Sequence, residues 1–206
     1  MKLINWKDDF LKRVVIIGAG ASGMLAAKVA SDRGYKVTVL EKQKRCGQKL
    51  LITGKGRCNI TNNCEIEELI ENVPTNGKFL YSAFYTFTND QVIDMFNDLG
   101  VETKTERGKR VFPVSDKAVD VVRALEKQMR SNKNVEVLLN SKVDKIEAQD
   151  GKVKKVILSD KREIECDSVI VATGGVSYPR TGSSGDGYKF ARNLGHTIIK
   201  PKASLI

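Results

Sequence analysis

Residues 13–41 read RVVIIGAGASGMLAAKVASDRGYKVTVLE. A short β-branched run over 13–17 is followed by small and apolar residues at helical spacing over 21–33, which Gly34 ends. Residues 36–40 form a second alternating apolar run. A strand, a helix and a second strand in so short a segment predict a compact βαβ unit with parallel strands.

A glycine motif joins the first strand to the helix, because residues 18–23 read GAGASG and match G-x-G-x-x-G. The first glycine allows a tight turn, the second lets the backbone approach a diphosphate, and the third lets the helix pack closely on the sheet. The helix start adds N–H groups and partial positive charge. We expect dinucleotide contacts at Gly18, Gly20, Ala21, Ser22 and Gly23; the alternative is a glycine turn without a ligand.

Glu41 ends the second strand, 18 positions after Gly23. A carboxylate at this strand end accepts hydrogen bonds from both ribose hydroxyls and repels a 2′-phosphate. Glu41, with its neighbour Lys42, is therefore a candidate cofactor-binding residue.

Composition restricts the class of protein. With 206 residues, 41% hydrophobic and 29% charged, the chain is typical of a soluble α/β protein, and disorder or collagen-like repeats are excluded. The formal net charge of +10 is weak support for a nucleic-acid partner, because the lysines are spread along the chain without an aromatic-basic cluster. We expect a small-molecule substrate instead, and no membrane span, because charged residues interrupt the apolar stretch early.

The cysteines do not indicate a metal or a disulfide. Cys46, Cys58, Cys64 and Cys166 lack the short paired spacing of a zinc site or a dithiol relay. We expect reduced thiols in a cytoplasmic protein, and no metal site.

The middle of the chain alternates loops and helices. Residues 42–63 are too rich in Gly, Lys, Thr and Asn for a helix and predict a functional loop. The remaining pattern predicts helices over 65–72 and 78–99 with an internal cap at 88–90, a hairpin of 102–105 and 110–112, a helix capped by Ser115 and running to about Arg130, and a strand over 135–139. The apolar stripe of that last helix consists of Val119, Val122, Leu125 and Met129.

The C-terminal third predicts a three-stranded meander over 142–149, 152–159 and 162–166, with a tight turn at Asp150–Gly151. An apolar strand over 168–173 follows, then a helix to about Asn193 and a last short strand over 197–199. The single histidine, His196, is expected to cap a helix or lie at the surface.

The features after Glu41 favour FAD over a nicotinamide cofactor, because a plain nicotinamide domain returns sooner to its sheet. In addition, the strand that follows the meander ends in Ala172, Thr173, Gly174 and Gly175. This end resembles the ATG signature of the glutathione-reductase-like FAD-binding fold, in which the strand end approaches the cofactor.

A family resemblance rests on residues 48–62, QKLLITGKGRCNITN. They resemble the T/S-G-x-G-R-C-N-x-T-N segment of the flavoproteins often called HI0933-like or BaiN-like, which are NAD(P)/FAD-dependent oxidoreductases. Residues 110–115 (RVFPVS), 174–179 (GGVSYP) and 181–188 (TGSSGDGY) agree with the same family, so the resemblance covers essentially the whole chain.

The resemblance implies an α/β, Rossmann-like FAD-binding domain of the glutathione-reductase type, a parallel sheet plus a β-meander. It places Lys49, Gly54, Arg57, Asn59 and Thr61 near the pyrophosphate or the isoalloxazine, and the backbone around Val143 at the adenine. Cys58 lies in the same loop and is expected to be a small packed residue of the cofactor-binding segment. Asp186 either caps the following helix or contacts the cofactor.

Chains of that family are about twice as long and return to the FAD domain near their end. Residues 1–206 are therefore expected to be one FAD-binding domain, incomplete at its C-terminus, with the substrate domain and the closing FAD segment absent. The expected function is two-electron hydride transfer by an FAD-dependent oxidoreductase, with NAD(P)H as candidate electron donor and no catalytic acid or base yet named. The alternatives are an NAD(P)-linked dehydrogenase and a non-enzymatic flavin- or RNA-binding module.

Overall fold

The computed structural model describes residues 12–202 and divides them into two units. The first unit contains residues 12–49 and 125–198, and the second contains residues 50–124 and 199–202. Each unit is considered by itself.

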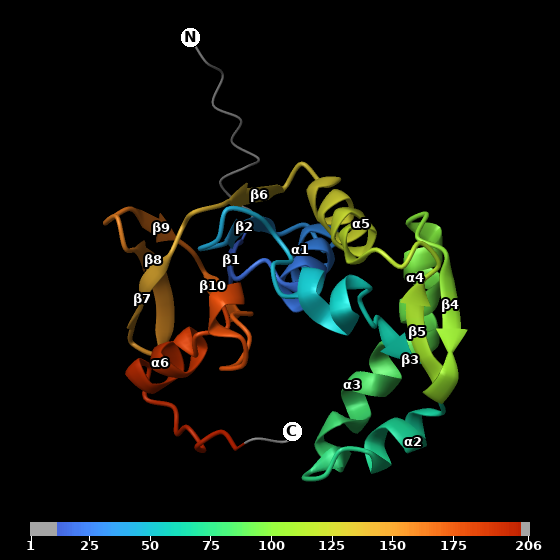
Figure 1. Ribbon diagram of the computed structural model, residues 1–206. Coiled ribbons are helices and arrows are strands. Elements are labelled where there is room, and N and C mark those ends of the chain that lie inside the picture. The colour runs from blue at the N-terminus through green and yellow to red at the C-terminus, as the bar shows by residue number, and fades with distance from the viewer. Residues whose placement is uncertain (1–11, 203–206) are drawn as a thin grey trace. The chain divides into compact units, whose positions relative to one another are not determined.

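A parallel sheet of four strands forms the centre of the first unit (Figure 1). The strands are β1 (Arg13–Ile17), β2 (Lys36–Leu40), β6 (Val135–Leu138) and β10 (Ser168–Val171), in the order β10-β1-β2-β6. In the register of the sheet, Ile17 pairs with both Leu40 and Val171. The carboxyl ends of the three strands therefore meet at one edge, which is where ligands bind in open α/β sheets.

Helix α1 (Ala21–Asp32) connects β1 to β2 and packs on the sheet through small and apolar residues. Met24 and Ala27 are buried on its inner face, against the buried side chains of β1 and β2. Each large apolar side chain buried in this way contributes about 1.5–3 kcal/mol relative to an exposed one. The predicted βαβ unit is confirmed, with both strand bounds as expected.

Two glycines of the motif are required by the backbone itself. Gly18 has φ +106°, a conformation that side chains rarely adopt. At Gly23, an added Cβ would lie 1.9 Å from the carbonyl oxygen of Gly18. The start of α1 therefore touches the turn that leaves β1, and only glycine allows this approach.

The predicted meander is also confirmed. Strands β7 (Val143–Gln149), β8 (Lys152–Leu158) and β9 (Glu163–Glu165) form an antiparallel sheet. Helix α6 (Asp186–Asn193) follows β10 and a short 3₁₀ turn, η4 (Pro179–Thr181). Phe190 of α6 joins the buried cluster that the meander forms with Val15, Ile17 and Leu40 of the parallel sheet.

The second unit contains a three-stranded antiparallel sheet in the order β3-β5-β4, together with short helices. Its elements are η1 (Leu50–Gly56), β3 (Thr61–Asn62), α2 (Ile66–Glu71), η2 (Gly77–Leu80), α3 (Tyr81–Thr86), α4 (Asn89–Asp98), β4 (Thr103–Glu106), η3 (Arg107–Lys109) and β5 (Arg110–Pro113). Thr88 caps α4 as predicted, in a reciprocal capping box with Gln91. Residues 42–63, which were predicted as a loop without helix, contain the 3₁₀ turns of η1.

Three further predictions were wrong. Helix α5 (Ala118–Arg130) begins three residues after Ser115, whose hydroxyl accepts only a 3.4 Å hydrogen bond from the Lys117 N–H. Val119 is 36% exposed, and Ala118 is buried in its place, so the buried stripe is one position out of phase there. Residues 197–199 form no strand in the described chain, because they pair with no neighbouring strand.

We expect Gly23→Ala to reduce the free energy of unfolding by about 3 kcal/mol, because the new methyl group overlaps a backbone oxygen that cannot move without the sheet. Urea denaturation followed by circular dichroism measures the change. Gly20→Ala is the matched control. Gly20 has φ −79° and no protein atom within 4 Å of an added Cβ, so a change below about 1 kcal/mol is expected. Equal losses for the two variants would contradict the assignment.

Candidate functional site

Three strand ends of the first unit are joined by backbone hydrogen bonds at the carboxyl edge of the sheet. The Gly18 N–H donates to the Leu40 carbonyl (2.8 Å), and the Ala172 N–H donates to the Ile17 carbonyl (2.9 Å). The glycine motif, Glu41 and the end of β10 are thus brought together, as the sequence predicted. Thr173, Gly174 and Gly175 continue from Ala172 along the same edge.

The amino end of α1 has N–H groups available at this edge. The first intrahelical hydrogen bond runs from the Met24 N–H to the Gly20 carbonyl (2.9 Å), so the N–H groups of Ala21, Ser22 and Gly23 precede it. The first turn has neither an acidic side chain nor a side-chain cap. A Cβ added at Gly20 would enter space without protein atoms within 4 Å, so the backbone is open to a ligand on this side.

The Glu41 carboxylate is fixed beside this helix end. Glu41 is 9% exposed. Its Oε2 accepts from the Ala19 N–H (2.8 Å) and its Oε1 from the Gln43 N–H (2.9 Å). Each carboxylate oxygen has two lone pairs, so both retain a site for a hydroxyl donor. The side chain is held in place before any ligand binds.

Lys42 connects the end of β2 to the start of α6. Its Nζ donates to the Asp186 carboxylate (2.7 Å) and to the Ser184 hydroxyl (2.6 Å). Burial by itself raises the pKa of Asp186, but the hydrogen bond and charge of Lys42 outweigh it and lower that pKa below its ordinary value. Gly185 occupies the N-cap position of α6, so the prediction that Asp186 caps this helix was wrong.

Lys49 lies against the segment that follows Gly175. Its Nζ donates to the Ser177 hydroxyl (2.7 Å) and to the Ser177 carbonyl (3.4 Å), and lies 5.8 Å from the centre of the Tyr178 ring. No carboxylate within residues 12–202 lies at ion-pair distance from Lys49. Ser177 and Ser184 were missed in the sequence, since hydroxyls in a Gly/Ser loop read as turn residues.

Val143 begins β7 with its side chain 6% exposed, inside the cluster shared with Leu40. Only its backbone is available to a ligand, and the prediction likewise concerned the backbone around Val143.

The predicted loop of the second unit holds Arg57 in a network of ion pairs. The guanidinium donates to Asp116 (2.8 Å) and Glu106 (2.5 Å), and Lys104 also pairs with Asp116 (2.8 Å). The guanidinium carbon lies 4.1 Å from the centre of the Phe112 ring. The hydrogen bond from Arg57 lowers the pKa of Glu106, and those from Lys104 and Arg57 lower the pKa of Asp116. Arg57 is thus neutralised within its own unit.

The other predicted residues of this loop shape its backbone. The Cys58 N–H donates to the Thr53 carbonyl (3.1 Å), and Cys58 has a left-handed conformation, φ +64°. The Asn59 side-chain amide is surrounded by acceptors on one side, and with its nitrogen on that side it donates to the carbonyls of Val111 (3.2 Å) and Thr61 (3.0 Å). At Gly54, an added Cβ would lie 3.0 Å from the Phe112 ring. Left-handed residues cluster at functional sites, but these contacts also suit a structural loop.

The thiols are poorly suited to redox chemistry. All four cysteines are free, and Cys46, Cys58 and Cys166 are buried. Burial is the main cause that raises the pKa of Cys58, that of Cys46 to about 12 and that of Cys166 to about 11. Since the thiolate is the reactive form, the prediction that Cys58 is a packed residue agrees with its environment.

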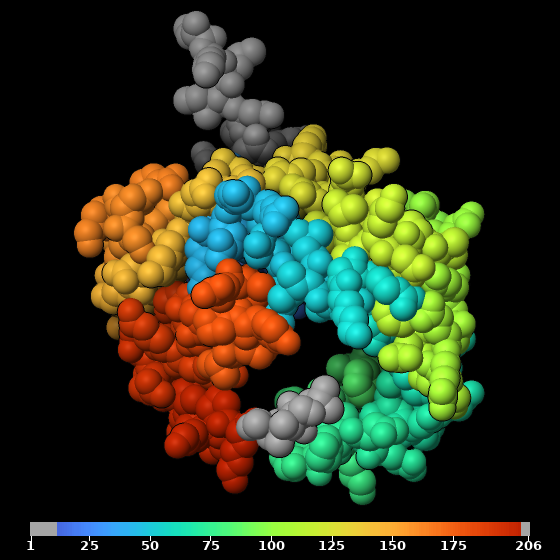
Figure 2. All heavy atoms as spheres, viewed as in Figure 1, coloured from blue at the N-terminus to red at the C-terminus, as the bar shows by residue number. Residues whose placement is uncertain are grey.

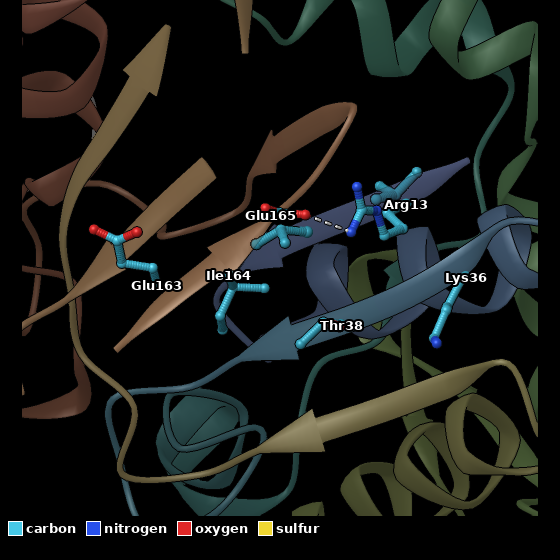
Figure 3. A pocket seen from close by; sticks show the side chains of 8 residues that line it. Arg13, Lys36, Thr38, Glu163, Ile164 and Glu165 are labelled. Carbon is cyan, nitrogen blue, oxygen red and sulfur yellow. Dashed lines mark hydrogen bonds and ion pairs between the residues drawn. The ribbon is translucent and has the colours of Figure 1, made fainter. Parts of the chain in front are cut away.

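Two clefts of the first unit lie away from this edge. One, of about 300 Å³, lies at the amino ends of β1 and β2, beside β9 (Figure 3). It is crossed by the ion pair between Arg13 and Glu165 (3.0 Å). The second, of about 900 Å³, shares these two residues and extends along Lys152 and Lys154 of β8. Both clefts belong to the edge opposite the glycine motif.

Two negative findings apply to residues 12–202. Within them, no three side chains of the His, Cys, Asp and Glu types come together as a metal ion would require. No helix in this part of the chain has the length and hydropathy needed to cross a membrane.

Comparison with known proteins gives a family and close relatives. The family model described as the HI0933-like protein Rossmann domain matches residues 12–203. A 3-dehydro-bile acid delta(4,6)-reductase of Clostridium scindens is 35% identical over 198 residues, covering 95% of this chain and 47% of the relative. A ribosomal RNA dihydrouridine synthase of Haemophilus influenzae is 32% identical over 199 residues, covering 93% of this chain and 47% of the relative. The chain thus spans about half the length of these relatives.

Among solved structures, the open conformation of a flavocytochrome c3 fumarate reductase is similar in fold. It has a TM-score of 0.70 and 21% sequence identity, and the match covers 91% of this chain and 41% of that one. The predicted Rossmann-like fold is confirmed by the family model, the parallel sheet and this likeness.

We expect Asp186→Asn to reduce the free energy of unfolding at pH 7 by about 1 kcal/mol, because it removes the charge that Lys42 binds. Since folding lowers the pKa of Asp186, its contribution is complete above the ordinary value of 3.8 and is lost as the pH falls through the lowered value. Denaturation curves of both proteins should therefore converge in acid. Asp144→Asn, whose carboxylate is exposed and 4.0 Å from Lys189, is the control. A difference that persists unchanged at low pH would contradict the ion-pair explanation.

Proposed function

Because this chain belongs to the HI0933-like family, we propose that it binds FAD at the carboxyl edge of its parallel sheet and is the N-terminal part of an FAD-dependent oxidoreductase. The observation that carries this proposal is the Glu41 carboxylate, fixed by two backbone N–H groups beside the open amino end of α1. A dinucleotide needs both parts, since its diphosphate binds the helix end and its ribose binds the carboxylate.

The residues of the first unit suit the cofactor. In the proposal, the N–H groups of Ala21, Ser22 and Gly23 bind the diphosphate, and the Gly20 backbone leaves room for it. Lys49 supplies a positive charge that no carboxylate in residues 12–202 neutralises. Bound FAD would supply two-electron hydride chemistry, and the protein's part is to orient it and adjust its electronics.

We keep as proposals the roles that the resemblance gives to the remaining residues. These are cofactor contacts by the backbone at Val143, by Ala172, Thr173, Gly174 and Gly175, by Lys42 and Asp186, and by the loop residues Gly54, Arg57, Cys58, Asn59 and Thr61. The ion pairs of Arg57 and Lys42 also support a structural role for these two residues, besides any contact with the cofactor. We also propose that both units serve one FAD-binding domain of a longer protein.

The names of the two relatives share a reaction type. A delta(4,6)-reductase of 3-dehydro-bile acids and a dihydrouridine synthase both saturate a carbon–carbon double bond that is conjugated with a carbonyl group. We propose the same reaction class here, with NAD(P)H as electron donor. The substrate gains one hydride and one proton across its double bond, and NAD(P)H is oxidised to NAD(P)⁺.

The two relatives differ in substrate class, and we propose a small unsaturated carbonyl compound. The second candidate is uridine in RNA. It is favoured by the positive charge of the first unit, because RNA phosphates bind Lys and Arg: residues 12–49 and 125–198 contain 22 Lys and Arg against 12 Asp and Glu. The four free cysteines support a reducing, cytoplasmic setting for either substrate.

We expect Gly20→Ala to weaken FAD binding at least tenfold while the protein still folds, because the methyl group enters the space reserved for the diphosphate. Titration of the apoprotein with FAD, followed by flavin fluorescence, measures the affinity. Gly34→Ala is the control for binding: an added Cβ there also has no neighbour within 4 Å, and its φ of +85° makes the substitution strained, but it precedes β2 at the other edge and should leave the FAD affinity unchanged. If the longer protein proposed above binds no FAD, or binds it as well after Gly20→Ala, the proposed site is wrong.

We expect the longer protein proposed above, loaded with FAD, to oxidise NAD(P)H under anaerobic conditions when 4-androstene-3,17-dione is added, because this steroid carries a double bond conjugated with a ketone. The saturated 3-ketosteroid is the matched control and should give no oxidation. The absorbance of NAD(P)H measures the rate, and a uridine-containing RNA in place of the steroid tests the second candidate. No NAD(P)H oxidation with either unsaturated substrate would argue against the proposed reaction class.

A further inference from the structure

Tyr178 combines a strained backbone with an exposed aromatic ring. Its φ and ψ are +56° and +64°, in the left-handed region, where a residue other than glycine is uncommon. Its relative exposure is 66%. Burial of the ring in a core therefore does not explain why a tyrosine stands at this position.

Hydrogen bonds from its neighbours hold the segment in this conformation. The Tyr178 carbonyl accepts from the Thr181 N–H (2.9 Å) and from the Thr181 hydroxyl (2.8 Å). Lys49 donates to both the hydroxyl and the carbonyl of Ser177. Farther along, the Gly185 N–H donates to the Gly175 carbonyl (3.1 Å), which folds the segment back on itself. The ring is thus presented to solvent by an ordered backbone.

The strand order places this segment on the side of β1 that lies opposite Glu41. Glu41 follows β2, the glycine motif follows β1, and residues 172–178 follow β10, on the other side of β1. A dinucleotide with its adenosine ribose at Glu41 and its diphosphate at α1 extends its second half toward β10. In the space-filling view, the segment after β10, coloured orange-red, lies at the surface (Figure 2).

We propose that the Tyr178 ring is a stacking surface for the isoalloxazine ring of FAD, and that Lys49 is the positioning residue that holds it there. This inference rests on the proposed cofactor function. A flat aromatic face gains from offset stacking with a conjugated ring, and the exposed phenol is available for it. An ammonium group has three donors, of which Ser177 accepts two, so Lys49 retains one for a ring carbonyl.

A structural role and a ligand role predict opposite effects of glycine. If Tyr178 only shapes the turn before Pro179, Tyr178→Gly leaves flavin binding unchanged. If it stacks on the flavin, the same change relieves the left-handed strain and leaves the melting temperature of the apoprotein equal or higher, while flavin binding weakens. Stability and binding then move independently.

The test is carried out in the longer protein proposed above and compares the wild type with Tyr178→Gly and Tyr178→Phe, using FAD as the probe. A stacked tyrosine quenches flavin fluorescence by donating an electron to the excited ring, and phenylalanine stacks but donates poorly. We expect brighter bound flavin in both variants, near wild-type affinity for Tyr178→Phe, and roughly tenfold weaker binding for Tyr178→Gly. Tyr35→Phe, which changes a tyrosine just before β2, is the control and should alter neither readout.

Bound-flavin fluorescence that stays at the wild-type level in Tyr178→Phe would overturn the inference, even if Tyr178→Gly failed to fold. Unchanged affinity of Tyr178→Gly would also overturn it and assign the residue to the turn. A wild-type longer protein that binds no FAD would instead overturn the proposed function. We expect Lys49→Met to raise the fluorescence of bound flavin by less than Tyr178→Phe does, because the loosened segment keeps Tyr178 stacked for less of the time. An unchanged fluorescence would show that Lys49 does not position Tyr178.

Discussion

The close approach between Gly23 and the Gly18 carbonyl is the constraint on which the rest of the site depends. A side chain has no space there, so α1 starts directly against the turn that leaves β1. This contact directs the amino end of the helix, with its N–H groups, at the carboxyl edge of the sheet. The same turn carries the Ala19 N–H that donates to Glu41, so the carboxylate is fixed beside the helix end.

The carboxyl edge collects its groups through parallel pairing. Since β2 and β10 both pair with β1 in register, the residues that follow Leu40, Ile17 and Val171 emerge side by side, although they are far apart in the sequence. The ion pair between Lys42 and Asp186 joins residues 144 positions apart, because Lys42 follows β2 and Asp186 lies in the segment that follows β10. The edge is therefore prepared by the backbone first, and side chains then fasten its loops together.

Local patterns predicted most of the fold. The βαβ unit, the meander, the Thr88 cap and the hairpin predicted at 102–105 and 110–112 all follow from spacing, caps and turn residues within short windows. The failures have physical reasons. Helix α5 starts after Ser115 because Pro113 and Asp116 form a turn first, with the Asp116 N–H bonded to the Pro113 carbonyl (3.0 Å). The segment 197–199 has strand-like residues but no strand to pair with in the described chain.

The sequence predicted where the candidate site lies, but not which of its cations are neutralised by ion pairs. The resemblance placed Lys49 and Arg57 alike near the pyrophosphate or the isoalloxazine, and Lys42 was a candidate only as the neighbour of Glu41. Their partners are distant, because Glu106 and Asp116 lie 49 and 59 positions from Arg57, and no local pattern foretells such pairs.

The ion pairs separate these three cations by function. Arg57 is neutralised by two carboxylates, and Lys42 by Asp186. Within residues 12–202, Lys49 hydrogen-bonds only to the neutral Ser177 and lies near the Tyr178 ring, so no negative side chain cancels its charge. A positive charge that is fixed in position and left uncompensated attracts an anion more strongly than one already paired. Of the three, Lys49 is therefore best suited to the anion-binding role proposed above, while Lys42 and Arg57 each fasten loops within their own unit.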